Sequence, residues 1–204
     1  MGLYERFLLP GLTSWVCASG SHGRYRQHVV PRAHGRVVEL GAGSGHNLPH
    51  YDARAVEHLW AVEPSAGMWR LARERLALGP RVEHLAASAE AVPLESAVAD
   101  TVVVTWALCT IPRPELALAE ARRLLKPGGR LLFAEHGEAP DEDVKRWQHR
   151  LDPVWNLFSG GCHINRDVPA LLTAAGFELE EFHAGYLPGL RPFSFNMRGV
   201  ARPR

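Results

Sequence analysis

The sequence predicts a doubly wound α/β domain, that is, a mostly parallel β-sheet covered by helices on both faces. The stretch 100–106 is β-branched almost throughout and apolar on both faces of a strand, a pattern typical of buried parallel strands. Strand-like and helix-like segments alternate between residues 36 and 135, which favours right-handed β-α-β units. A glycine-rich turn at residues 41–45 follows an apolar run, and such turns offer backbone N–H groups to ligands in α/β folds.

Composition limits the class of protein. The 204 residues include 46% apolar and 22% charged residues, with a formal net charge of +1, which is ordinary for a single globular domain. No dense basic stripe is present, so we expect no nucleic-acid partner. No run approaches the ~18 apolar residues of a transmembrane helix. Cys17, Cys109 and Cys162 form no C-x-x-C pair, so we expect no disulfide framework, no metal site and a reducing, cytoplasmic setting.

The first thirty residues form an apolar block ahead of the predicted sheet. Residues 3–16 and 24–30 have partly helical spacing, with Pro10 as a break and a flexible Gly/Ser-rich link at 19–23. Two interpretations remain open for this block. It is either an appendage that packs against the sheet or a mobile lid that closes over a ligand cleft.

The remaining elements follow in order along the chain. Ser65 can cap the helix that comes after the second strand, and Pro114 suits the first turn of the next helix. Strands are predicted at 36–40, 58–63, 81–86, 100–106 and 130–135, and helices at 66–76 and 114–125. In the tail, helices at 141–157 and 166–175 precede strands at 177–183 and 193–201.

The glycine-rich turn has two nucleotide-binding interpretations. The dinucleotide fingerprint G-x-G-x-x-G needs its third glycine at position 46, where this chain has His46. The pattern present is E-x-G-x-G-x-G, from Glu39 to Gly45. It resembles the first motif of the class I methyltransferases that depend on S-adenosylmethionine (SAM), although a glycine-rich turn without a ligand is the plain alternative.

Further motifs of the same family occur in register from about residue 36 to the C-terminus. Glu63 lies 22 residues after Gly41, at a strand end where an acid can accept hydrogen bonds from both ribose hydroxyls. Ser88-Ala89-Glu90 resembles the segment on the adenine side, with Ser88 in place of the usual aspartate. Residues 125–129 match the L-x-P-G-G turn of the family.

The resemblance implies a Rossmann-like methyltransferase fold with SAM as cofactor and S-adenosylhomocysteine as product. Its sheet has seven strands in the order 3-2-1-4-5-7-6, with strand 7 antiparallel. The single domain divides into an N-terminal helical lid (1–34), a SAM-binding core (35–136) and substrate-side helices with a final hairpin (137–204). The implied cofactor-binding residues are Glu39, Gly41, Ala42, Gly43, Gly45, Asn47, Glu63, Pro64, Met68, Ser88, Ala89, Glu90 and Thr105.

A narrower resemblance lies in the tail. Glu135-His136, Trp147-Gln148, 152–155, Gly161-Cys162 and Arg166 are similar to the alkyl-thiol S-methyltransferases of animal microsomes and their small bacterial relatives. The similarity implies transfer to a small, apolar thiol, without the apolar N-terminal membrane anchor of the animal proteins. Three alternatives stay open. They are N- or O-methylation of a lipid- or quinone-like molecule with peripheral membrane contact, a non-catalytic SAM-binding regulator, and a nicotinamide oxidoreductase, which His46 and the final hairpin disfavour.

His136 is the candidate catalytic residue, because it ends the fifth strand at the edge where α/β ligands bind. A buried, neutral imidazole there could accept the proton of the acceptor or orient it, and we expect burial to lower the pKa of His136. A loop histidine without a role is the alternative. Residues expected to contact the acceptor, each with a core role as the alternative, are Tyr4, Trp106, Cys109, Trp147 and Trp155.

Overall fold

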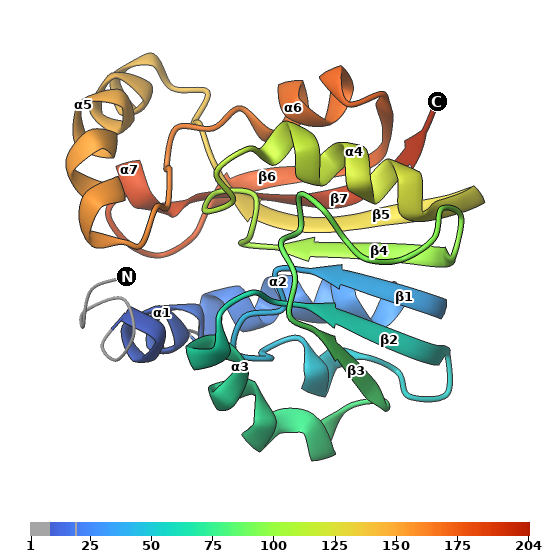
Figure 1. Ribbon diagram of the computed structural model, residues 1–204. Coiled ribbons are helices and arrows are strands. Elements are labelled where there is room, and N and C mark those ends of the chain that lie inside the picture. Colours follow the sequence, from blue (N-terminus) through green and yellow to red (C-terminus); the bar gives the residue numbers. More distant parts are fainter. Residues whose placement is uncertain (1–8, 19) are drawn as a thin grey trace.

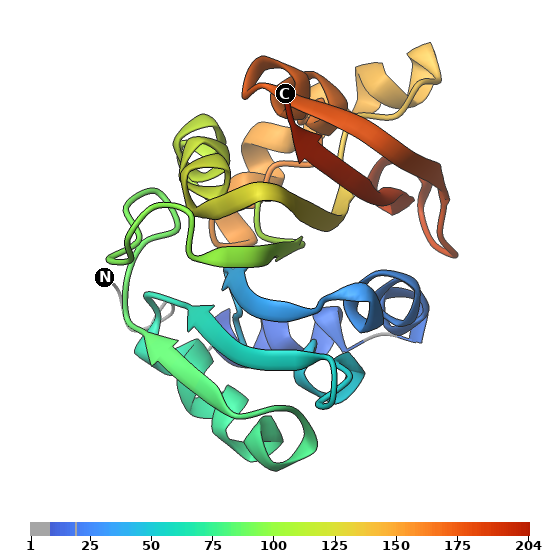
Figure 2. The ribbon, with the colours of Figure 1, turned by 90° about the vertical axis from the view of Figure 1, so that its right-hand side faces the viewer.

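The computed structural model describes residues 9–18 and 20–204, so Tyr4 lies outside the described residues. It contains the predicted seven-stranded sheet in the order β3-β2-β1-β4-β5-β7-β6 (Figure 1). Strand β7 runs antiparallel to both β5 and β6. The first five strands pair with one another in parallel, as β2 with β3, β1 with β2, β1 with β4 and β4 with β5. The strands are β1 (Gly35–Leu40), β2 (Val56–Val62), β3 (Val82–Leu85), β4 (Ala99–Thr105), β5 (Leu125–His136), β6 (Phe177–Tyr186) and β7 (Phe195–Pro203). Figure 2 shows the twist of the sheet, with β3 and β6 at opposite edges.

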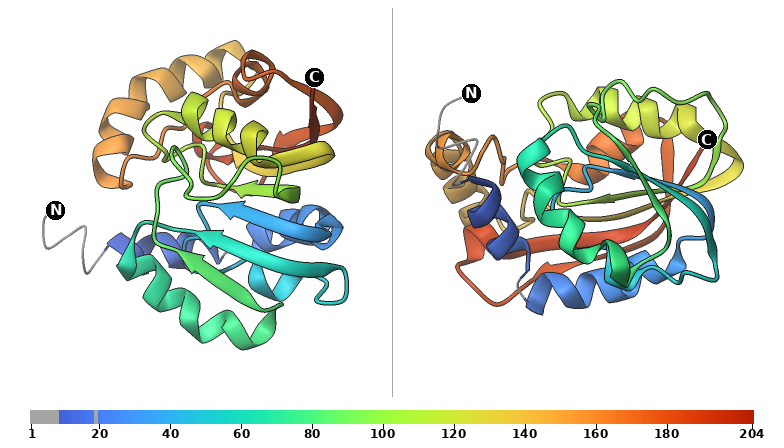
Figure 3. Two further views of the ribbon diagram at one scale, coloured as in Figure 1. Left: turned by 45° about the vertical axis from the view of Figure 1, so that its right-hand side comes forward. Right: turned by 60° about the horizontal axis from the view of Figure 1, so that its bottom comes forward.

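Helices cover both faces of the sheet, as the apolar central strands require. The helices are α1 (Leu9–Cys17), α2 (Gly20–Val29), α3 (Ala66–Ala72), α4 (Pro114–Leu124), α5 (Glu142–Phe158), α6 (Val168–Ala174) and α7 (Arg191–Ser194). Short 3-10 helices occupy Val30–Arg32, Leu48–His50 and Arg73–Leu78. One apolar cluster joins α4 and α6 to β4 and β5, and a second joins the end of α2 to the opposite face. Figure 3 shows α4 and α2 on opposite faces of the sheet.

Local chemistry explains where several helices begin and end. The Ser65 hydroxyl accepts a hydrogen bond from Met68 N at the start of α3. Proline stands in the first turn of α4, where its missing N–H costs nothing. Gly128 has φ +81°, which allows the sharp turn inside the extended Leu125–His136 segment.

One expectation for the N-terminal block is wrong. Residues 20–23, expected to be a flexible link, form the start of α2. Pro10 lies at the start of the described part of α1, and the preceding segment, on which the expected break depends, lies outside the described residues. Packing explains why residues 20–23 are helical, because α2 lies against β5 and β7 and tertiary contacts override the weak helix propensity of glycine and serine. Within the described residues, no helix is long and apolar enough to cross a membrane.

The carboxyl ends of the parallel strands carry the features of interest. In Figure 1 the strands β1, β2 and β4 point to the left, and α1, α5 and α7 lie beyond their ends. Loops at this edge of an α/β sheet form ligand sites, because strand ends and helix N-termini meet there.

Candidate functional site

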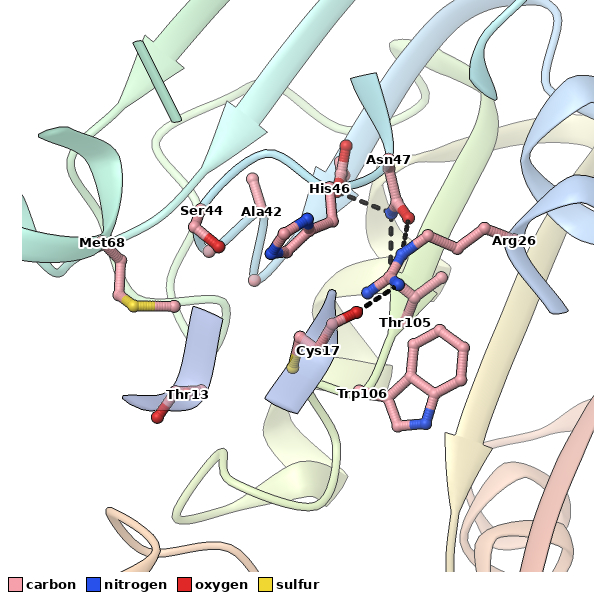
Figure 4. Close-up of a pocket in the computed structure, with 13 residues that line it drawn as sticks. Thr13, Cys17, Arg26, Ala42, Ser44, His46, Asn47, Met68, Thr105 and Trp106 are labelled. Carbon is pink, nitrogen blue, oxygen red and sulfur yellow. Dashed lines mark hydrogen bonds between the residues drawn. The ribbon is translucent and has the colours of Figure 1, made fainter. Parts of the chain in front are cut away.

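A pocket opens at the carboxyl end of β1, the edge at which α/β folds bind their ligands. Of the residues that the sequence predicted for the site, its lining includes Glu39, Gly41, Ala42, Gly43, Asn47, Met68, Thr105 and Trp106. Residues that the sequence did not predict also line it, namely Thr13, Cys17, Arg26, Ser44 and His46 (Figure 4).

The floor of the pocket is the glycine loop after β1. Gly41 and Gly43 have φ values of +73° and +55°, which side chains other than glycine rarely adopt. A Cβ atom on Gly41 would lie 2.5 Å from the Cβ atom of Ala107, and one on Gly43 would lie 3.3 Å from Met68 Cε. The glycines therefore allow both the turn and a close approach of a ligand to the backbone.

A buried hydrogen-bond network supports this loop from below. Asn47 Nδ2 donates to Glu39 Oε1 and to Thr105 Oγ1, both at 2.8 Å, and Tyr51 Oη donates to Glu39 Oε2 at 2.8 Å. Arg26 Nε donates to Asn47 Oδ1 at 3.0 Å. Burial raises the pKa of Glu39 to about 7, although its hydrogen bonds favour the charged form.

Glu63 connects the glycine loop to α3. One carboxylate oxygen accepts from Gly43 N at 2.9 Å and the other from Ser65 N at 2.7 Å. Burial raises the pKa of Glu63, against the effect of these two hydrogen bonds. Each carboxylate oxygen can accept a second hydrogen bond, so the group can still bind a ligand hydroxyl.

Helices α1 and α2 form one wall of the pocket. The Arg26 side chain is buried, lies 4.7 Å from the Trp106 ring centroid and donates to the Cys17 carbonyl oxygen at 2.8 Å. His46 Nε2 donates to the Ser14 carbonyl oxygen at 2.9 Å. Burial and the nearby Arg26 lower the pKa of His46 to about 4, so this histidine is neutral at neutral pH.

Cys109, His136 and Cys162 form a second group of functional side chains at the same edge, and we call them the Cys/His cluster. Their ligand atoms all lie within 4.8 Å of one another, and His136 Nε2 is 3.1 Å from Cys162 Sγ. The residues come from the loop after β4, the end of β5 and the loop after α5. The sequence placed Cys109 and His136 near the acceptor but did not predict their contact with Cys162.

The net pKa shift expected for His136 is wrong in sign. Burial alone would lower its pKa, but the Cys162 thiolate and the Glu135 carboxyl outweigh burial and raise the pKa of His136. Hydrogen bonds from Cys109, His136 and Trp155 favour the thiolate and lower the pKa of Cys162. The contact between His136 Nε2 and Cys162 Sγ therefore couples the two side chains, since each favours the charged form of the other.

Several predicted site residues lie outside the pocket lining. They include Gly45, Glu63, Pro64, Ser88, Ala89 and Glu90. The Glu90 carboxylate accepts from Arg113 N at 2.7 Å. The Trp147 side chain is 54% exposed, whereas Trp155 packs against Phe193 with 4.7 Å between ring centroids. Their functional roles stay predictions.

Of the residues that the sequence did not predict, Ser44 and His46 lie in or directly after the glycine motif, and Cys162 belongs to the Gly161-Cys162 pair of the tail motif. Arg26 had no such signal, because it lies in a segment rich in polar residues, with only a weak helical pattern of apolar positions. A basic residue in such a segment usually lies in solvent.

Comparisons with known proteins agree with this architecture. A family model described as a methyltransferase domain matches residues 38–133. The ubiquinone/menaquinone biosynthesis C-methyltransferase UbiE of Rubrivivax gelatinosus is 32% identical over 185 residues, which cover 78% of this chain and 69% of that protein. Thiol S-methyltransferase TMT1B of Rattus norvegicus is 30% identical over 136 residues, which cover 64% of this chain and 55% of that protein.

A demethylmenaquinone methyltransferase of Clavibacter sepedonicus is 35% identical over 118 residues, which cover 58% of this chain and 48% of that protein. The chain thus spans about half the length of the last two relatives.

Solved structures share the fold. A SAM-dependent methyltransferase of Thermotoga maritima has a TM-score of 0.64 at 23% identity and covers 98% of this chain and 94% of that chain. The CurJ carbon methyltransferase has a TM-score of 0.68 at 19% identity and covers 98% of this chain and 60% of that chain.

Proposed function

Because the chain belongs to the class I SAM-dependent methyltransferase family, we propose that it methylates the sulfur of a small, apolar thiol. Its cofactor is SAM, whose sulfonium supplies the methyl group for an in-line displacement. The acceptor is the part of the proposal that needs support. The observation that carries it is the Cys/His cluster, where an imidazole lies 3.1 Å from a sulfur atom at the end of β5.

The pocket fits SAM in three respects. Gly41 and Gly43 have positive φ values and no side chains, so the loop can present bare backbone to a ligand. The Ser44 hydroxyl is buried and, among the described residues, has no hydrogen-bond partner, which suits a polar ligand. The acidic side chains Glu39 and Glu63 favour a ligand with positive charge and hydroxyl groups.

Within that fit, Glu63 binds the ribose hydroxyls and Glu39 orients the loop at the methionine end. The adenine side belongs to residues 88–90, beyond β3. Helices α1 and α2 form the wall that excludes water from the methyl group, which is the role expected of a lid.

The Cys/His cluster favours a thiol as acceptor. An opposite charge within about 4–6 Å stabilises a thiolate, and the thiolate is the reactive form of a thiol. The His136 imidazole, which lies 3.1 Å from Cys162 Sγ, can donate a hydrogen bond to a sulfur atom and so orient it. The reacting sulfur and methyl carbon must approach to about 3–3.5 Å, and His136 can position the sulfur for that approach.

Transfer to a quinone-like acceptor is the second candidate, because the relative from Rubrivivax gelatinosus is named as a quinone C-methyltransferase. The test incubates the purified protein and SAM with a panel of alkyl thiols, reduced quinones, phenols and amines, and identifies products by mass. We expect S-methylated thiols alone. Products only from quinones would replace the thiol by the second candidate, and SAM binding without any product would indicate a regulator.

A matched pair of histidine variants tests the role of the cluster in this reaction. His136→Gln should lower thiol turnover by about 10- to 100-fold, the effect of losing a hydrogen bond to a charged group, about 1.5–3 kcal/mol. His149→Gln is the control, because His149 is half exposed and pairs with Glu138 outside the pocket. Equal activity of the two variants would contradict a role for His136.

A further inference from the structure

We propose that Cys109, His136 and Cys162 bind a thiophilic divalent cation, with Zn²⁺ as the ion that this set of ligands matches best. Two thiolates and one imidazole are ligands that zinc prefers. Three protein ligands leave the fourth tetrahedral position open, as in catalytic zinc sites. The use of that position by an acceptor thiol rests on the proposed function, whereas the metal site itself does not.

The distances are close to those of a tetrahedral site. With Zn–S bonds of about 2.3 Å and a Zn–N bond of about 2.0 Å, two sulfur ligands lie about 3.8 Å apart, and sulfur and nitrogen about 3.5 Å apart. In the cluster, His136 Nε2 and Cys162 Sγ are 3.1 Å apart, and all three ligand atoms lie within 4.8 Å. Side-chain adjustments of about 1 Å or less would therefore form the site, within the freedom of a rotamer.

The backbone holds the three ligands in place. His163 N donates to the Cys109 carbonyl oxygen at 2.8 Å, which ties the loop of Cys162 to the loop of Cys109. The Asp152 carboxylate contacts both His163 Nδ1 at 2.8 Å and Ile164 N at 2.7 Å, and so fixes the same loop on α5. The ligand set is thus built before any ion arrives, which lowers the cost of binding.

A buried carboxylate beside the cluster supplies a second, independent observation. Glu135 is fully buried, and its Oε1 accepts from Ala107 N at 2.8 Å and Leu108 N at 2.9 Å. Its Oε2 is also buried and has no hydrogen-bond partner among the described residues. An unpaired carboxylate oxygen is costly in the interior, and a nearby cation would offset that cost.

With the ion bound, His136 would hold an acceptor thiol through the metal rather than by a direct hydrogen bond, and the metal site would also explain how that thiol is activated. A thiol that takes the fourth position loses its proton to solvent, because a metal-bound thiol is deprotonated. The thiolate sulfur then forms a bond to the methyl carbon, and the bond from that carbon to the sulfonium sulfur breaks with its electron pair remaining on that sulfur. The products are a neutral methyl thioether, S-adenosylhomocysteine and the released proton.

Cobalt titration of the full chain tests the site directly. The protein is kept reduced and free of oxygen, and Co²⁺ serves as the probe because thiolate ligands give it a charge-transfer band and tetrahedral geometry gives it strong visible absorption. We expect one equivalent to bind with both features and Zn²⁺ to displace it. Cys162→Ser should weaken cobalt binding by more than about 100-fold. The loss of a residue that only orients a metal ligand lowers metal affinity by about 10- to 100-fold, so a larger effect indicates a direct ligand.

Cys17→Ser is the matched control, because Cys17 is the remaining cysteine and lies on the wall of the cofactor pocket. It should keep the cobalt spectrum, and Cys162→Ser should keep its SAM affinity by calorimetry, which shows that it is folded. Absence of the charge-transfer band in wild-type protein with three free thiols would overturn the proposal, as would loss of the band in Cys17→Ser. Because no acceptor is present, this failure is separate from a failure to methylate thiols.

Discussion

Replacing Glu39 with glutamine should change how the stability of the protein depends on pH. The Glu39 side chain is 2% exposed and accepts hydrogen bonds from Asn47 and Tyr51. Burial raises its pKa from 4.5 to about 7, although these hydrogen bonds and the nearby Arg26 favour the charged form. Glutamine has a similar shape, can accept from Asn47 and donate to Tyr51, and does not titrate.

The sign and size of the effect follow from the two pKa values. Between pH 4.5 and about 7, the folded protein holds a proton on Glu39 that the unfolded chain has released. The stability that this proton provides is complete below pH 4.5 and is lost as the pH rises through about 7. A pKa higher by about 2.5, at about 1.36 kcal/mol for each pKa unit, corresponds to about 3 kcal/mol in the free energy of unfolding.

Urea denaturation at pH 5, 6, 7 and 8, followed by circular dichroism, measures this effect. From pH 5 to pH 8, Glu39→Gln should gain about 2–3 kcal/mol of stability relative to wild type. Other buried carboxyl groups are present in both proteins and cancel in the difference. Glu57→Gln, at an exposed position of β2, is the control and should follow wild type. Parallel pH curves for wild type and Glu39→Gln would refute the reasoning.

Two further substitutions test the cofactor pocket. Glu63→Ala should weaken SAM binding by about 1.5–3 kcal/mol, the range for a hydrogen bond to a charged group, and calorimetry that shows unchanged affinity would contradict its role on the ribose. Gly41→Ala should destabilise the fold by more than Gly128→Ala. Both glycines have positive φ, but a Cβ atom on Gly41 would lie 2.5 Å from the Ala107 Cβ atom, whereas a Cβ atom on Gly128 would meet no atom within 4 Å. Thermal melting compares the two variants, and equal losses would show that strain rather than the close approach sets the effect.

The central sheet could be predicted from the sequence because its signals are local. Strand β4 is apolar on both faces and lies between β1 and β5, as such a strand should. The order of the strands in the sheet could not be predicted from any single strand. It came from the resemblance to a family, which several motifs at the expected spacing indicate. Edge strand β6 is mostly exposed and extends to Tyr186, three residues beyond its predicted end, because its pairing with β7 continues there.

The site was harder to predict wherever it depends on contacts between distant segments. The glycine loop could be predicted because its residues are adjacent in the chain. The Cys/His cluster could not be, because its members are 27 and 26 residues apart and only the fold brings them together. The sign of the His136 pKa shift depended on the same contact, since burial alone would have lowered it.

Arg26 shows what such a contact contributes to the site. Its guanidinium is buried, and Asn47 separates it from the Glu39 carboxyl, donating to the acid and accepting from the arginine. The neutral Asn47 amide therefore gives a hydrogen-bond partner both to the Arg26 guanidinium and to the Glu39 carboxyl, and it keeps the two groups from direct contact. Because Arg26 also donates to the Cys17 carbonyl oxygen, the same side chain ties α1 to the base of the glycine loop. The position of the wall formed by α1 and α2 is therefore coupled to the network that supports the cofactor loop.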